Sequence, residues 1–148
     1  GQCQFCPAGW LWNAGQCYYF SSAKRNWEQS REDCCSRGAQ LVTIQANTTL
    51  DFLMHTANTE VFHVGLKRDN SQTDWKWLDG TALNGRFPIQ RPSFYPVCGR
   101  VSRFGLSRGQ CKEGLGWVCK QSAATLQWLG PLPPTFLWGN TTYVCMGP

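Results

Sequence analysis

Nine cysteines in a chain of 148 residues limit what this protein can fold into more than any other feature of its sequence. So many thiols are hard to keep reduced, and their spacing lacks the two-Cys, two-His pattern of a structural zinc site. We therefore expect disulfides and an oxidising compartment. The sequons at Asn47 and Asn140 fit the secretory route, in which N-glycans are added, although such short motifs also arise by chance.

The length and the hydrophobic content of the chain predict one domain. A chain of 148 residues, 42% of them hydrophobic, can bury one core but is too short for a second core to be expected. No window approaches the roughly 20 apolar residues of a membrane span, and the residues after Gly1 lack the charged and apolar regions of a signal peptide. We expect an ectodomain cut from a longer precursor that is either secreted or anchored in a membrane.

Local patterns predict two helices and several strands, which is an α+β chain. One helix is expected between Asn26 as N-cap and Gly38 as terminator, and a second is expected to begin at Asn47 as its cap. A hairpin is predicted at 6–20, a brief extended link at 41–44, and strands at 61–66, 75–78, 97–101, 110–112 and 117–119. Residues 79–96, with two glycines and three prolines, predict a long irregular loop.

Positive charge is concentrated in one stretch of the chain. Between Thr81 and Lys120, seven cationic residues stand against a single acid, Glu113, and the remainder of the chain is nearly neutral. A localised positive face favours an acidic protein surface or an anionic glycan as partner, and the simpler interpretation is a set of solvated arginines. No nucleic-acid recognition motif is present, so nucleic acid is not expected as a partner.

Six blocks of residues occur in a characteristic order. They are the Cys6 to Cys17 hairpin ending in Tyr18-Tyr19-Phe20, Trp27 to Cys34 with Gly38-Ala39-Gln40-Leu41, Val64-Gly65-Leu66, Trp75-Lys76-Trp77-Leu78-Asp79-Gly80, the pair Cys98 and Cys111, and Trp117-Val118-Cys119. In this order they resemble the C-type lectin-like domains, in particular the branch found on natural killer cells and other leukocytes. The resemblance covers roughly residues 6–121.

The resemblance implies a C-type lectin-like fold: α+β, with two helices, antiparallel sheets and a long irregular loop. It implies three disulfides as well, which join Cys6 to Cys17, Cys34 to Cys119 and Cys98 to Cys111. We expect residues 1–5 to be a stalk remnant, 6–121 the domain, and 122–148 an uncharged aromatic extension packed on the domain, because exposed apolar stretches of that length are liabilities.

Three cysteines remain outside these pairs, so at least one must stay unpaired within the chain. One hypothesis joins Cys35 to Cys145, which would fasten the tail to the first helix, and leaves Cys3 near the stalk for an interchain bridge. The alternative is an unpaired or artefactually bridged cysteine.

Acids and bases for a metal site or a catalytic site are scarce. Sugar-binding members of the family resemble one another in a Glu-Pro-Asn or Gln-Pro-Asp triplet and a Trp-Asn-Asp triplet, and neither occurs here. A hard cation needs several oxygen ligands, so we expect no metal and no cofactor. Only His55 and His63 could serve as imidazole bases, so no enzyme is expected, and His63 is assigned a half-buried packing role.

The resemblance implies recognition of a cell-surface protein without calcium. That partner would be a lectin-like receptor or ligand of natural killer or leukocyte type, and a viral mimic is also compatible with the resemblance. We expect the ectodomain of a type II plasma-membrane protein, and a secreted form and a homodimer stay open. The expected contact residues combine aromatic anchors with cationic side chains: Arg86, Phe87, Arg91, Phe94, Tyr95, Arg100, Arg103, Phe104 and Arg108.

Other interpretations of the same surface stay open. Some of its aromatics, above all Phe87 and Tyr95, could fill the loop's own small core instead of contacting a partner. A calcium-independent binder of anionic glycans would use the same positive loop and depend strongly on salt. A secreted toxin-like lectin-fold subunit is a further alternative.

Overall fold

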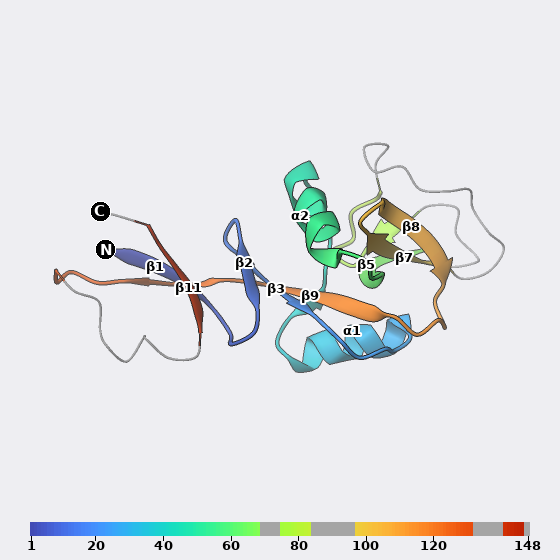
Figure 1. The fold of residues 1–148 in the computed structure, drawn as a ribbon, viewed down its shortest axis with the longest axis horizontal. Coiled ribbons are helices and arrows are strands. Elements are labelled where there is room, and N and C mark those ends of the chain that lie inside the picture. Colours follow the sequence, from blue (N-terminus) through green and yellow to red (C-terminus); the bar gives the residue numbers. More distant parts are fainter. Residues whose placement is uncertain (69–74, 84–96, 132–140, 147–148) are drawn as a thin grey trace. The chain divides into compact units, whose positions relative to one another are not determined.

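The computed structural model describes residues 1–68, 75–83, 97–131 and 141–146 (Figure 1). The chain gathers into two compact units. The central unit comprises Phe20–Cys119, and the terminal unit joins Gly1–Tyr19 to Lys120–Pro148. Each unit contains two disulfides of its own.

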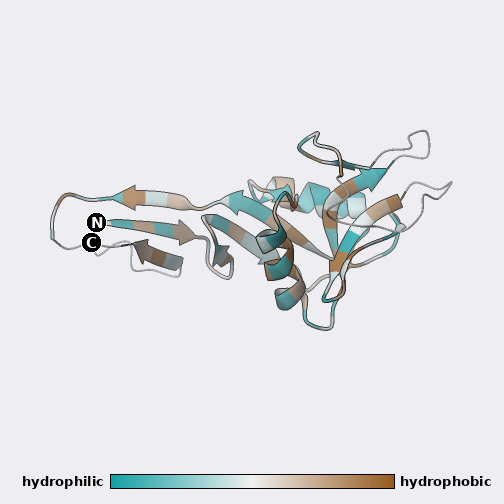
Figure 2. Ribbon diagram, turned by 90° about the horizontal axis from the view of Figure 1, so that it is seen from above, coloured by the Kyte–Doolittle hydropathy of each residue, from teal (hydrophilic) through white to brown (hydrophobic). Residues whose placement is uncertain are grey.

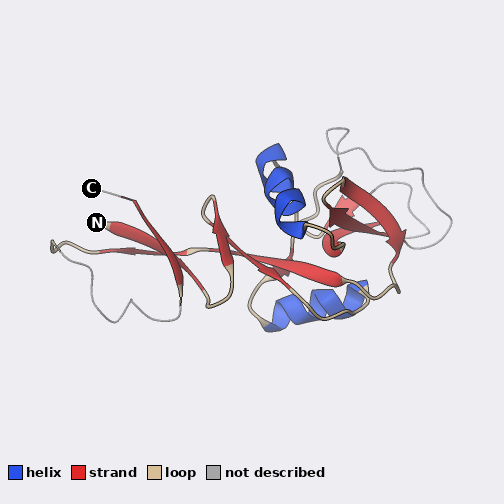
Figure 3. Cartoon of the chain, in the orientation of Figure 1, coloured by secondary structure: helices blue, strands red, loops and turns tan. Residues whose placement is uncertain are grey.

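The described part of the central unit contains two helices and strands β4 to β9 (Figure 3). Its sheet has the order β9-β5-β7-β8, with β4 on β9 and β6 on β5. The β5–β9 pair is parallel, whereas β5 pairs antiparallel with β6 and β7. In chain order the elements are α1 (Trp27–Ser36), β4 (Gln40–Leu41), α2 (Asn47–Ala57), β5 (Phe62–Arg68), β6 (Lys76–Trp77), β7 (Val97–Ser102), β8 (Gly105–Gln110) and β9 (Gly116–Ser122), whose last residues belong to the terminal unit.

Helix α1 begins and ends where local signals place it. The Asn26 side chain accepts the Gln29 N–H at 2.8 Å, and the Gln29 side chain accepts the Asn26 N–H at 3.2 Å, which completes a capping box. After the helix, Gly38 adopts φ 73°, a conformation that disfavours other residues. The predicted first helix is confirmed.

Helix α2 exists as expected, but its cap is different. Asn47 is the first helical residue rather than the cap, and Ala46 occupies the N-cap position without a side-chain hydrogen bond. The expected capping role of Asn47 is therefore wrong. The helix is held instead by packing, because Leu53 and Ala57 are buried while Asn47, Asp51 and His55 face solvent.

Apolar side chains from both helices and from the sheet meet in one buried core. Trp27 on α1 and Leu53 on α2 are buried with Leu66 on β5, and the Trp27 indole N–H donates to the main-chain oxygen of Val64 at 2.8 Å. At Gly65 a Cβ atom would lie 2.6 Å from the main-chain oxygen of Leu41, so only glycine allows this approach. Hydrophobic and hydrophilic residues are interspersed along the strands and helices, as expected for layers with one buried face (Figure 2).

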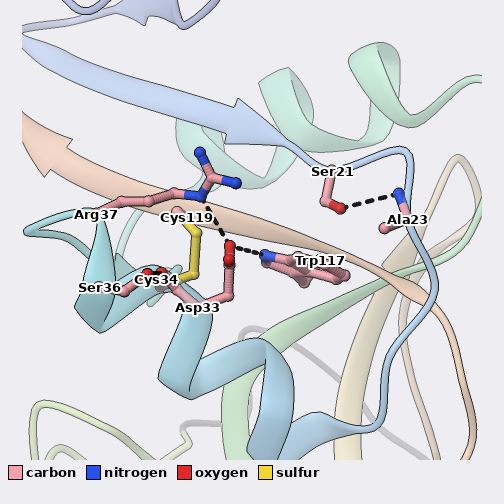
Figure 4. Close-up of polar contacts among 8 residues, drawn as sticks. All are labelled: Ser21, Ala23, Asp33, Cys34, Ser36, Arg37, Trp117 and Cys119. Carbon is pink, nitrogen blue, oxygen red and sulfur yellow. Dashed lines mark hydrogen bonds and ion pairs between the residues drawn. A yellow bond between two sulfur atoms is a disulfide. The ribbon is translucent and has the colours of Figure 1, made fainter.

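Two disulfides in the central unit join the pairs that the resemblance implies. Cys34 on α1 is bonded to Cys119 on β9, and Cys98 on β7 is bonded to Cys111 just after β8. Beside the first of these, the carboxylate of Asp33 accepts the indole N–H of Trp117 at 2.9 Å (Figure 4). Helix α1 is thereby fixed to strand β9 by a covalent bond and a hydrogen bond.

The terminal unit is built from the two ends of the chain. Its described strands are β1 (Gln2–Cys6), β2 (Leu11–Asn13), β3 (Gln16–Phe20), β10 (Ala124–Gln127) and β11 (Thr142–Met146). Strand β1 lies between β10 and β11, antiparallel to both, and β2 and β3 form the predicted hairpin, closed by the Cys6–Cys17 disulfide.

The structure corrects the pairing proposed for the three remaining cysteines. Cys3 faces Cys145 in the β1–β11 register, and the two are disulfide-bonded. The expected bond between Cys35 and Cys145 is therefore wrong, and Cys3 is not available for an interchain bridge. Cys35 is left as an exposed free thiol.

The domain boundaries stay a prediction, but residues near both ends of the chain form paired strands. Residues 2–6, expected to be a stalk remnant, form a strand that pairs with two strands of the C-terminal extension. The extension thus packs on the N-terminal residues within its own unit.

Candidate recognition surface

Four of the nine predicted contact residues lie on one described element, the β7–β8 hairpin. Arg100 is on β7, Arg103 and Phe104 form the turn, and Arg108 is on β8. The other five fall in the segment 84–96, outside the described residues: Arg86, Phe87, Arg91, Phe94 and Tyr95.

The hairpin turn presents an aromatic side chain to solvent. Ser102 pairs with Gly105, which leaves Arg103 and Phe104 as the two turn residues, and Gly105 adopts φ 114° where the chain reverses. The Ser102 hydroxyl accepts the Phe104 N–H at 3.2 Å. Phe104 is 83% exposed, and the Arg103 guanidinium lies 4.8 Å from the centre of its ring.

The same turn borders a hollow at the C-terminal half of α2. The hollow has a volume of about 450 Å³ and is lined by Asp51, Met54, His55, Asn58 and Arg103. Sequence reasoning did not place the α2 residues on this surface. The signal would have been the exposed polar side chains of α2, but nothing in the sequence pairs them with the turn.

Arg100 differs from Arg103 in its exposure and in its hydrogen-bond partner. Its side chain is only 13% exposed, and its Nη1 atom donates to a Glu113 carboxylate oxygen at 3.2 Å. This hydrogen bond holds the pKa of Glu113 below its ordinary value. Arg100 therefore stabilises the segment after β8, and its contact with a partner stays a prediction.

His63 is wholly buried on β5, rather than half-buried as predicted. Its Nε2 atom lies 3.0 Å from two main-chain oxygens, those of Arg25 and Glu113, so this nitrogen carries the proton and donates to both. Its Nδ1 atom has no hydrogen-bond partner among the described residues. Burial is the main cause that lowers the pKa of His63 below 6.5, so the ring stays neutral and structural at neutral pH.

Two further features of the described residues are their possible metal ligands and their sequon. Within those ranges no group of three or more His, Cys, Asp or Glu side chains could hold a metal ion. Asn47 is exposed at the start of α2, and Asn140 lies outside the described residues. Neither described helix is long and apolar enough to cross a membrane.

Comparison with known proteins gives two relatives, of which the first is named as a receptor. The chain is 33% identical over 119 residues to the killer cell lectin-like receptor subfamily G member 1 of Homo sapiens, an alignment that covers 80% of this chain and 59% of the relative. It is 32% identical over 146 residues to the CD209 antigen of Symphalangus syndactylus, covering 90% of this chain and 38% of the relative. The chain thus spans about six tenths or less of these relatives.

Solved structures have the same fold. The Kupffer cell C-type lectin receptor Clec4f superposes with a TM-score of 0.67 at 28% identity, over 76% of this chain and 82% of that one. The natural killer cell receptor Ly49C superposes with a TM-score of 0.66 at 19% identity, over 76% of this chain and 90% of that one, which shows the fold alone.

A family model described as "Lectin C-type domain" matches residues 23–121, which begin just before α1 and end one residue before the end of β9. That range contains both helices, the Cys34–Cys119 and Cys98–Cys111 disulfides and the β7–β8 hairpin. The chain therefore belongs to the C-type lectin domain family.

Proposed function

We propose that this chain is an extracellular recognition domain that binds a protein on a cell surface, without calcium and without catalysing a reaction. The observation that carries the proposal is the charge of residues 81–120, where seven cations stand against one acid. That acid, Glu113, is already bound by Arg100. A hard cation needs several carboxylate or carbonyl oxygens, and this stretch offers arginines in their place.

A protein partner is favoured over a glycan by the kind of residues on this surface. Arginine and aromatic side chains are the types enriched at the energetic centres of protein interfaces. The exposed Phe104 beside Arg103 is one such combination. The relative named as a killer cell lectin-like receptor supports a partner of the natural killer or leukocyte kind.

We assign the nine predicted contact residues to this surface, and we place the recognition domain at 6–121 within the ectodomain of a type II membrane protein. A glycan at Asn47 is part of the same proposal, because an exposed sequon in a secreted chain is a substrate for glycosylation. A calcium-independent binder of sulfated glycans is the second candidate, favoured by the same excess of positive charge.

The test is a screen of the soluble, multimerised chain against an array of leukocyte surface ectodomains, with and without EDTA. We expect at least one ectodomain to be captured, with equal strength in both conditions. A captured signal that disappears with EDTA would overturn calcium independence. Binding confined to heparin, and lost at high salt, would favour the glycan alternative instead.

A further inference from the structure

The hollow beside the β7–β8 turn combines residues from two elements that lie far apart in the sequence. Asp51, Met54, His55 and Asn58 come from α2 and the residue that follows it, and Arg103 comes from the turn. All four polar side chains among them are exposed. Together with Phe104, we call these residues the α2–turn patch.

The ionisable side chains of the patch form no ion pair among the described residues, unlike the acids of two neighbouring elements. Among the described residues, Glu28 pairs with Arg31 and Glu113 pairs with Arg100. Within the same ranges, Asp51, His55 and Arg103 form no salt bridge with one another or with other side chains. The charges of Asp51 and Arg103 are therefore available to a partner.

Phe104 supplies the apolar part of the patch. An 83% exposed phenylalanine at a hairpin tip contributes little to the core of its own fold, and transfer of such a ring into an apolar pocket strengthens binding by about tenfold to a hundredfold. The guanidinium of Arg103, 4.8 Å from the ring centre, would reach the rim of the same pocket. The turn thus offers an apolar anchor and a cation at one point.

We infer that the α2–turn patch docks a protein whose surface carries an apolar pocket with a carboxylate on its rim. Phe104 enters the pocket and Arg103 donates to the carboxylate, while His55 and Asn58 provide further polar contacts. This inference rests on the proposed function and names the chemistry of its partner. It also extends the contact surface from the loop and hairpin to helix α2.

Asp51 favours a protein over a polyanion as the occupant of the hollow. Its carboxylate lines the same hollow as Arg103, so a densely sulfated glycan would be repelled there. An isolated carboxylate can instead bind on the Arg103 side and avoid Asp51. The mixed charge of the hollow therefore fits a protein surface, which presents single charges among apolar groups.

The test compares variants of the full chain. Phe104→Ala and Arg103→Glu alter the patch, and Leu129→Ala and Lys24→Glu are matched controls, because Leu129 is fully exposed in the terminal unit and Lys24 is exposed before α1. The probes are the ectodomains captured by the unmodified chain and dodecapeptides selected on it from a random phage library. Heparin serves as the polyanion probe.

We expect Phe104→Ala and Arg103→Glu each to weaken ectodomain binding at least tenfold, with the melting temperature unchanged and both controls within twofold. Selected peptides should combine an acidic residue with apolar side chains and lose binding to both patch variants. Asp51→Lys should strengthen heparin binding.

Captured ectodomains that bind both patch variants as well as the unmodified chain would overturn this inference and leave the proposed function standing. If no ectodomain is captured, the proposed function fails, and the selected peptides then test the patch. The inference is overturned if no peptide can be selected, or if the selected peptides bind the patch variants as well as the unmodified chain. A homodimer in sedimentation that Phe104→Ala abolishes would identify a second copy as the occupant and overturn it as well.

Discussion

Removal of the Cys34–Cys119 disulfide should destabilise this protein more than removal of Cys98–Cys111. The first bond closes a loop of 85 residues and the second a loop of 13. In the chain-entropy model these loops correspond to about 4.6 and about 2.9 kcal/mol of stabilisation, a difference of about 1.7 kcal/mol. For a chain of this size that difference separates the melting temperatures by about 3–7 °C.

The assay is thermal unfolding followed by circular dichroism for two double variants, Cys34→Ala with Cys119→Ala and Cys98→Ala with Cys111→Ala. Both cysteines of a pair are replaced because Cys35, an exposed free thiol next to Cys34, could otherwise capture Cys119. A non-reducing peptide map confirms that the other bridges are intact. Equal melting temperatures, or a lower one for the second variant, would refute the assignment of stability to loop length.

Three further predictions concern the central unit. Burial holds the pKa of His63 in the folded chain below its unfolded value of 6.5, so at acidic pH the unfolded state binds more protons than the folded state. Acidification should therefore lower the free energy of unfolding, and should lower it less in His63→Gln. Urea denaturation at about pH 7.5 and about pH 5.0 measures both. Gly65→Ala should cost about 1–3 kcal/mol in the same assay because its Cβ would meet the Leu41 main-chain oxygen. Gly114→Ala, whose added Cβ would lie 3.9 Å from the Lys24 Cβ, should change stability by less than about 0.5 kcal/mol. Equal costs at the two glycines would contradict the steric argument. Asp33→Ala should cost about 1–3 kcal/mol by leaving a buried indole N–H without its acceptor, and an unchanged melting temperature would contradict this.

The sequence by itself was sufficient for the features that depend on neighbouring residues. Asn26 and Gln29 form their capping box within one turn, and Gly38 ends the same helix, so a local pattern contains all the information. The order of the motifs supplied the fold and three disulfide pairs by resemblance. It did not identify the N-cap of α2, because Ala46 has no polar side chain that could signal one.

Only the tertiary structure decided the contacts between distant segments. Cys145 pairs with Cys3, 142 residues away, because the β1–β11 register sets them opposite each other, and no spacing rule contains that register. Arg100 and Arg103 look alike in the sequence pattern, yet Arg100 is held by Glu113 while Arg103 faces solvent beside α2. The sequence determined that residues 81–120 form a basic stretch with several aromatic side chains. Which of its side chains are free to bind depends on strand register and packing, which arise from the whole chain and not from any one part of it.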